Sequence, residues 1–297
     1  MSSTALPAGP GPGPTRWWNG GALVLLGLAV LYVPTYWSAA GSLWQSDDHA
    51  HGPIILAVAA WLFWRERSAW QALPARADSG FGWAALLLGL ACYLTGRAFD
   101  SSVFVFGSQP LVVAGAVLLT AGRPGLRQVG FAVVYLLFMV PLPGVLVDAA
   151  TGPLKQWISV IAESVLYAAG YPIARSGVVI SIGQYQMLVA DACSGLHSMF
   201  SLAALGTLFI HLAGHPGRGH RLLMLAAVLP IAFVANVVRV MALILVTYHF
   251  GDEAGQGFLH GAAGVVLMLT ALAGFFLLDA TLARLVSART PRQAARG

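Results

Sequence analysis

Residues 222–248 read LLMLAAVLPIAFVANVVRVMALILVTY and carry a single charged side chain, Arg239. The run is longer than the roughly 20 apolar residues that a helix needs to cross a lipid bilayer. The rest of the chain is similar, because 58% of its 297 residues are hydrophobic and 9% are charged. A water-soluble domain cannot arrange such a composition around one core without exposing large apolar patches. The sequence therefore predicts an all-α polytopic membrane protein.

Eight apolar runs are candidates for transmembrane helices. They cover residues 21–37, 52–64, 81–96, 103–121, 129–147, 193–213, 222–248 and 258–278, and the second must borrow flanking residues to span. We expect one transmembrane domain over residues 17–287, between a disordered cytoplasmic leader, 1–16, and a basic cytoplasmic tail, 288–297. The first run lacks a small-residue cleavage site, which predicts a retained anchor.

The basic residues predict the orientation, because arginine resists translocation across the membrane. Most of them fall at alternate connections and at both ends of the chain: Arg16, Arg65, Arg67, Arg76, Arg123, Arg127, Arg218, Arg221, Arg284, Arg289, Arg292 and Arg296. Arg97, Lys155 and Arg175 fall on the other side. We therefore expect both termini in the cytoplasm and the connection 148–192 outside. This distribution also accounts for the sequence pI of about 9.6 and argues against a nucleic-acid partner.

The outer connection 148–192 has two parts with different patterns. Apolar residues recur at helical spacing in residues 154–166, which predicts an amphipathic helix lying near the membrane interface. Residues 177–189 combine Val178-Val179-Ile180, a turn signal at Gly183 and a second short apolar segment. This pattern predicts a small β-hairpin just before the helix that follows Cys193.

Cys193 lies in Asp191-Ala192-Cys193-Ser194-Gly195, where a transmembrane helix is expected to begin. A helix N-terminus favours negative charge and so increases the thiolate fraction available for attack. The alternative is an inert buried thiol, which is our interpretation of the mid-span Cys92. Two cysteines give no disulfide framework, and no Cys/His spacing is typical of zinc or haem, so we expect no metal or cofactor.

Arg239 and Asn236 are three residues apart on one face of an apolar helix. An ionisable group in a membrane is costly and indicates function, although a snorkelling or internally paired arginine is the alternative. At ~1.5 Å per residue, Arg239 lies ~27 Å from Arg221 at the inner end of the run. This distance predicts a position near the outer surface, at the depth of Cys193.

His260 opens the last apolar run directly after an acidic outer loop, so it is expected at the same depth. Together the three residues would supply an acyl-transfer site in which Cys193 attacks, His260 moves protons and Arg239 stabilises an oxyanion or orients the substrate. His197, one turn after Cys193, is an alternative base. His51, at the outer entry to the second run, is either a substrate contact or part of a solvated helix cap.

Several short motifs in this order resemble the exosortase/archaeosortase family of membrane transpeptidases, and the resemblance is closest to the exosortase B type. The matching pieces are His51-Gly52, Trp61-Leu62-Phe63-Trp64-Arg65, Pro141-Leu142-Pro143, Ala192-Cys193-Ser194-Gly195, Asn236-Val237-Val238-Arg239 and His260-Gly261. The resemblance implies that Cys193, Arg239 and His260 correspond to the family's proposed catalytic residues. Asn236, Asp191, Ser194 and His51 would support them or bind substrate.

The resemblance also implies a substrate and a location. The substrates would be exported proteins whose C-terminal signal combines a Pro-Glu-Pro-like motif, a transmembrane helix and a basic tail. The enzyme, a thiol protease or transpeptidase, would lie in the bacterial cytoplasmic membrane with its active site facing the periplasm. It would pass the cleaved protein to an unknown envelope acceptor.

Two other interpretations remain open. The chain would be a polytopic transporter or a lipid- or polysaccharide-export protein if Arg239 binds an anion and Cys193 is incidental. It would be a scaffold of an envelope export complex if the polar residues are dispensable. Reactivity of Cys193 from the outer face distinguishes the peptidase from the transporter.

Overall fold

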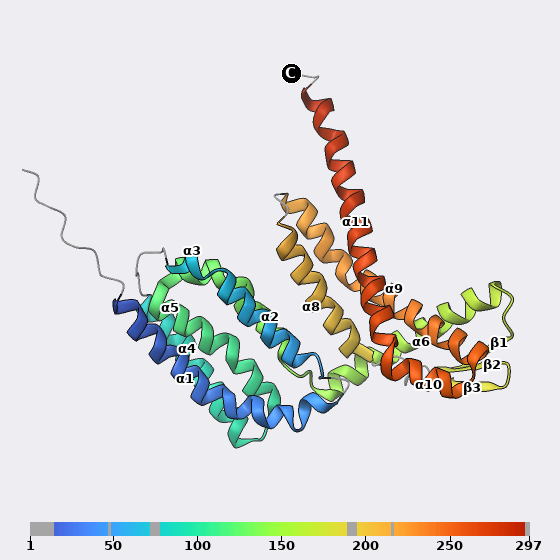
Figure 1. Ribbon diagram of the computed structural model, residues 1–297, viewed down its shortest axis with the longest axis horizontal. Helices are drawn as coiled ribbons and strands as arrows, with labels where there is room; N and C mark the ends of the chain where they lie inside the picture. Colours follow the sequence, from blue (N-terminus) through green and yellow to red (C-terminus); the bar gives the residue numbers. More distant parts are fainter. Residues whose placement is uncertain (1–14, 47–48, 72–77, 189–194, 215–216, 295–297) are drawn as a thin grey trace, which may run out of the picture. The chain divides into compact units, whose positions relative to one another are not determined.

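A computed structural model describes residues 15–46, 49–71, 78–188, 195–214 and 217–294, almost all of which are helical (Figure 1). The chain forms two compact units, Met1–Val140 and Pro141–Gly297. The expected leader, residues 1–16, lies almost entirely outside the described residues.

The first unit contains five helices and two short 3₁₀ turns within the described residues. They are α1 (Thr15–Ala40), η1 (Leu43–Gln45), α2 (Gly52–Arg65), α3 (Arg67–Gln71), α4 (Ser79–Ala98), α5 (Ser102–Tyr135) and η2 (Leu136–Met139). Helices α4 and α5 approach each other closely through glycines: a β-carbon at Gly89 would lie 2.7 Å from Cγ2 of Val112. Small residues that allow such approach are typical of helix pairs in membranes.

Helix α5 folds back on itself at Gly122, whose φ of 65° and ψ of −165° are not helical. Val117, before the break, packs in one cluster with Val129 and Val133, after it, which a straight helix would hold more than ~15 Å apart. Glycine adopts this conformation without the penalty that a side chain imposes. The two apolar runs expected at 103–121 and 129–147 are therefore joined as the two arms of α5.

The second of these runs ends earlier than its pattern predicts. Helical structure stops at Met139, and a new helix, α6 (Gly144–Ala168), begins five residues later. Pro141 and Pro143 explain the break, because proline donates no hydrogen bond and disfavours the helical conformation of the residue before it.

The second unit is built around α9 (Arg218–Phe250). Its other helices are α6, α8 (Gly195–Ala213), α10 (Asp252–Gly261) and α11 (Ala263–Ala294). Apolar side chains of α8, of α11 and of one half of α9 form a shared core: Met199, Leu202, Met224, Val228, Ala232, Ala235, Leu267, Ala271 and Phe275. These contacts bring three helices of the unit together along α9.

The other half of α9 packs against α6 and a small sheet. The strands β1 (Ile173–Ser176), β2 (Val179–Ile182) and β3 (Tyr185–Leu188) pair antiparallel in the order β1-β2-β3. Their shared core consists of Ile158, Ala162, Leu166, Ile173, Ile180, Ile182, Val237, Val240, Leu243 and Ile244. The sheet thus has one more strand than the two-stranded hairpin expected over residues 177–189.

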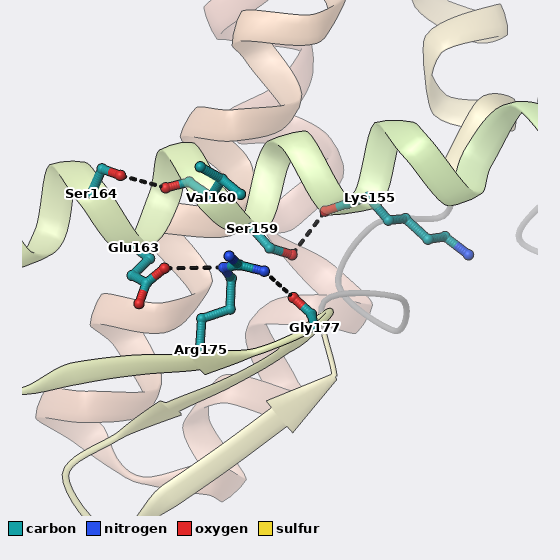
Figure 2. Close-up of polar contacts among 7 residues, drawn as sticks. All are labelled: Lys155, Ser159, Val160, Glu163, Ser164, Arg175 and Gly177. Atoms are coloured by element: carbon teal, nitrogen blue, oxygen red, sulfur yellow. Dashed lines mark hydrogen bonds and ion pairs between the residues drawn. The ribbon is translucent and has the colours of Figure 1, made fainter.

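A polar contact joins the sheet to α6 (Figure 2). Arg175 of β1 donates from Nε to Oε2 of Glu163 at 3.0 Å and from Nη1 to the carbonyl of Gly177 at 2.7 Å. Both turns of the sheet begin with a glycine of positive φ, Gly177 at 64° and Gly183 at 56°. Tight two-residue hairpins favour glycine at this position.

Five helical segments in the described residues are long and apolar enough to cross a membrane. They are Ala22–Ala40, Ser79–Ala98, Ser102–Met139, Arg218–Phe250 and Ala263–Leu285, and two shorter apolar helices are Gly52–Arg65 and Met199–Ala213. The chain is therefore a polytopic helical membrane protein. The number differs from the expected eight because two apolar helices are short and because α5 contains two apolar runs in one element.

Candidate functional site

Asn236 and Arg239 lie one turn apart on α9, and both are buried. Asn236 is fully buried and Arg239 is 8% exposed, and neither lacks a partner within the protein. They share a stripe of the helix with Leu243 and Thr247, at spacings of three and four residues. A cation and an amide are thus enclosed by protein within the long apolar run of the helix.

The start of α8 lies level with these residues. Helices α8 and α9 are joined by a short connection and run antiparallel, with a β-carbon at Gly206 lying 3.1 Å from Cγ2 of Val228. Along α8, Gly206 lies ~17 Å from Gly195. Along α9, Val228 lies the same distance, ~17 Å, from Arg239. Gly195, the first residue of α8, is therefore at the level of Arg239.

Helix α10 approaches the same level from the other direction. The chain turns at Gly251, whose φ is 90°, and α10 folds back so that Gly255 lies against Thr247 of the stripe. Along α10, His260 follows Gly255 by ~7.5 Å. Along α9, Arg239 lies ~12 Å from Thr247, the residue that Gly255 contacts. The backbone of His260 is therefore within ~5 Å of the level of Arg239, measured along the axis of α9. The fold thus directs α10 toward the stripe that carries Asn236 and Arg239.

A family model described as transmembrane exosortase (EpsH) matches residues 43–277. The chain belongs to the transmembrane exosortase family. Membership implies a membrane cysteine peptidase or transpeptidase whose substrates are exported proteins with sorting signals. Neither a curated protein nor a solved structure matches this exosortase.

Part of the predicted site of the exosortase lies outside the described residues, namely Asp191, Cys193 and Ser194. His260 lies in α10, near its end, rather than at the start of the last long helix, α11, which begins at Ala263. The positions that are described, Asn236, Arg239 and the backbone of α10, belong to the second unit.

His51 belongs to the first unit. It precedes α2 at the cap position without making a side-chain cap hydrogen bond. Its Nε2 instead lies 3.2 Å from the carbonyl oxygen of Phe138, which ties the start of α2 to η2. The exosortase therefore uses His51 in a contact between helices of one unit.

Two features near the site were not predicted from the sequence. One is α10 as a separate helix packed along α9, for which the spacing of Gly251 and Gly255 is the available signal. The other is the ion pair of Glu163 and Arg175, whose opposite charges both lie in the connection 148–192. Within the described ranges, no three His, Cys, Asp or Glu side chains are grouped as a metal site requires.

Proposed function

We propose that this exosortase is a membrane cysteine transpeptidase. It cleaves C-terminal sorting signals of exported proteins at the outer face of the cytoplasmic membrane and passes the cleaved protein to an envelope acceptor. The observation that carries the proposal is the enclosed pair Asn236 and Arg239, approached by the start of α8 and the end of α10 at one level of α9. Membership of the exosortase family supports the same chemistry.

The proposed topology has eight crossings and cytoplasmic termini. In the first unit, Arg123 pairs with Asp78 at 2.6 Å at the end where α2 ends and α4 begins, whereas Arg97 lies at the opposite end of α4. In the second unit, His220 contacts Asp279 at 2.7 Å, close in sequence to Arg218, Arg221 and Arg284. The positions of Arg123 in the first unit and of Arg218, Arg221 and Arg284 in the second support this assignment of the cytoplasmic ends.

Counting the two arms of α5 separately supports the number of crossings. With the short helices α2 and α8, the described helices then supply α1, α2, α4, two arms of α5, α8, α9 and α11. A reporter fused after residue 189 should indicate the outer side. A cytoplasmic signal from that fusion would contradict the topology and with it the outer position of the site.

The proposed reaction begins with attack of the Cys193 thiolate on the carbonyl carbon of the scissile peptide bond. The carbonyl oxygen becomes an oxyanion, which the guanidinium of Arg239 stabilises through charged hydrogen bonds. The C–N bond then breaks, and the leaving amine takes a proton from His260, leaving a thioester on Cys193. An acceptor nucleophile, deprotonated by His260, attacks the thioester and releases the thiolate.

The remaining predicted residues have supporting roles in this proposal. Asn236, one turn from Arg239, orients the guanidinium or the substrate. Asp191 and Ser194 flank the nucleophile in sequence, and His51 is a candidate substrate contact. His197 is the alternative base if substitution of His260 leaves the activity and its pH dependence unchanged.

Substitution of the nucleophile tests the proposal. Cys193→Ala and Cys193→Ser should abolish processing of a tagged substrate that ends in a Pro-Glu-Pro-like motif, a hydrophobic helix and a basic tail, because neither side chain provides a thiolate. The matched control is Cys92→Ala, which should process at the parent rate at equal membrane levels. Processing by Cys193→Ala at the parent rate would exclude the thiol mechanism, and anion flux by that variant would favour a transporter.

A further inference from the structure

Strand β3 forms one edge of the sheet, and its backbone groups can be assigned to two sides. The two-residue loop at Gly183 makes Ile182 and Tyr185 the hydrogen-bonded pair that closes the hairpin. Because such pairs alternate along an antiparallel ladder, Ile180 and Met187 form the next one. The N–H and C=O groups of Gln186 and Leu188 therefore point away from β2.

These outward groups, which we call the β3 edge, have no strand beside them in the part of the chain that the structure describes. Within the described residues, the sheet ends with β3, and no backbone hydrogen bond outside the helices and strands involves Gln186 or Leu188. An unpaired row of backbone donors and acceptors is a template for another extended chain.

The two edges of the sheet differ in their protection. The β1 edge follows Pro172 and carries Arg175, whose side chain points toward α6 and pairs with Glu163 (Figure 2). Proline and an inward-pointing charge are devices by which proteins prevent an edge from pairing. The β3 sequence, Tyr185-Gln186-Met187-Leu188, contains neither. The β1 edge is thus protected against pairing with another strand, whereas the β3 edge is not.

Strand β3 is anchored to the sheet by the packing of one of its faces. Tyr185 and Met187 pack against the core that Ile180, Ile182 and Ile244 form, whereas Gln186 is exposed on the opposite face. A strand that is already ordered loses little conformational freedom when a peptide pairs with it. The β3 edge is therefore preorganised for strand addition.

We propose that the β3 edge binds the substrate, pairing with an extended segment next to the scissile bond as a fourth strand. This inference rests on the proposed function. β3 continues in sequence to Cys193 after Leu188, and five extended residues reach at most ~17 Å. A segment paired with β3 is therefore bound within a short span of chain from the nucleophile. Main-chain hydrogen bonds supply the binding, as in other complexes formed by strand addition.

Photo-crosslinking tests the position of the substrate with a matched control. Gln186 and Ala174 are exposed on the same face of the sheet, and both flank Ser181 of β2, so they lie ~10 Å apart at opposite edges. A benzophenone side chain at position 186 should crosslink to the tagged substrate held by the Cys193→Ala protein, and one at position 174 should not. Equal crosslinking from both positions, none from position 186, or a crosslink to a second copy of this chain would overturn the proposal.

A backbone substitution tests the hydrogen bond itself. Gln186→Pro removes an outward donor but no bond to β2, so the sheet should remain intact. We expect KM for the substrate to rise roughly tenfold, the loss of about one hydrogen bond, with kcat largely kept. Gln186→Ala keeps the donor and should raise KM much less.

The outcomes separate this inference from the proposed function. Labelling of Cys193 by a thiol reagent at the parent rate shows that the Gln186→Pro site remains folded. If the parent protein cuts the substrate and the folded Gln186→Pro protein has the parent KM, the β3 edge does not bind substrate although the function stands. If the parent protein cuts no sorting signal, the proposed function itself is wrong.

Discussion

Thr247 of α9 and Gly255 of α10 lie so close together that a β-carbon at Gly255 would overlap the hydroxyl oxygen of Thr247. This contact fixes how α10 folds back along the stripe of α9 that carries Asn236 and Arg239. A side chain at position 255 must therefore displace the Thr247 hydroxyl, and a side chain larger than a methyl group is expected to move α10 and, with it, His260.

Gly255→Val should reduce processing strongly while the protein still inserts, because overpacking of this kind costs about 1–3 kcal/mol and moves the backbone. Gly257 is the matched control, since a β-carbon there would meet nothing within 4 Å. Gly257→Ala should process at the parent rate. Substrate turnover at equal membrane levels decides, and parent turnover by Gly255→Val would show that the position of α10 is unimportant.

Arg239→Lys should insert normally and lose most activity. Lysine keeps the positive charge but lacks the parallel N–H donors of the planar guanidinium group. If Arg239 stabilises an oxyanion, the expected loss in kcat is roughly 10²-fold or more. Arg123→Lys is the control, since Arg123 is mostly exposed in its pair with Asp78 and should tolerate lysine. If Arg239→Lys turns over substrate at nearly the parent rate, the hydrogen-bond geometry of the Arg239 guanidinium is not required for activity.

Gly122→Ala should destabilise the first unit by about 1–3 kcal/mol, because the positive φ of Gly122 at the fold of α5 is strained for any residue with a β-carbon. Gly107→Ala, in the first arm of α5 where a β-carbon has open space, should be neutral or slightly stabilising. Thermal unfolding of both purified variants in detergent measures the difference. Equal midpoints would mean that the fold of α5 does not depend on glycine.

Glu163→Gln should lower stability by no more than about 1 kcal/mol, because the Glu163 and Arg175 side chains are 30% and 23% exposed and water weakens their attraction. Arg175→Gln should cost a little more, since its contact with the carbonyl of Gly177 is lost as well. A double-mutant cycle, read by thermal unfolding, isolates the ion pair. A coupling energy of zero would show that packing alone holds the sheet on α6.

The sequence predicts well those features that depend on local composition. The apolar runs and the break between residues 121 and 129 follow from hydropathy. The cost of a charge in lipid singles out Arg239, but the burial of its side chain was not predicted. The end of α5 and η2 at Met139 was also within reach, because Pro141 and Pro143 mark it.

Features that depend on contacts between distant residues were not predicted. Strand β1 has no strong apolar alternation of its own, and its pairing with β2 is stabilised by the core beneath Ile173 and by Arg175 reaching Glu163. Likewise, the polar sequence of α10 resembles a loop until Gly255 is placed against Thr247. Tertiary packing decides both, and a single sequence does not encode it in a periodic pattern.

The enclosure of Arg239 also has a consequence for biogenesis. A ribosome delivers α9 to the membrane after α6 and α8 but before α10 and α11 exist, so at that moment only part of the packing along α9 can form. Holding the cation in lipid alone is costly, which keeps the newly made α9 from settling as an independent span. We therefore expect stable insertion of α9 to depend on the helices that pack along it, and a chain truncated near Phe250 to accumulate less in the membrane than the full chain.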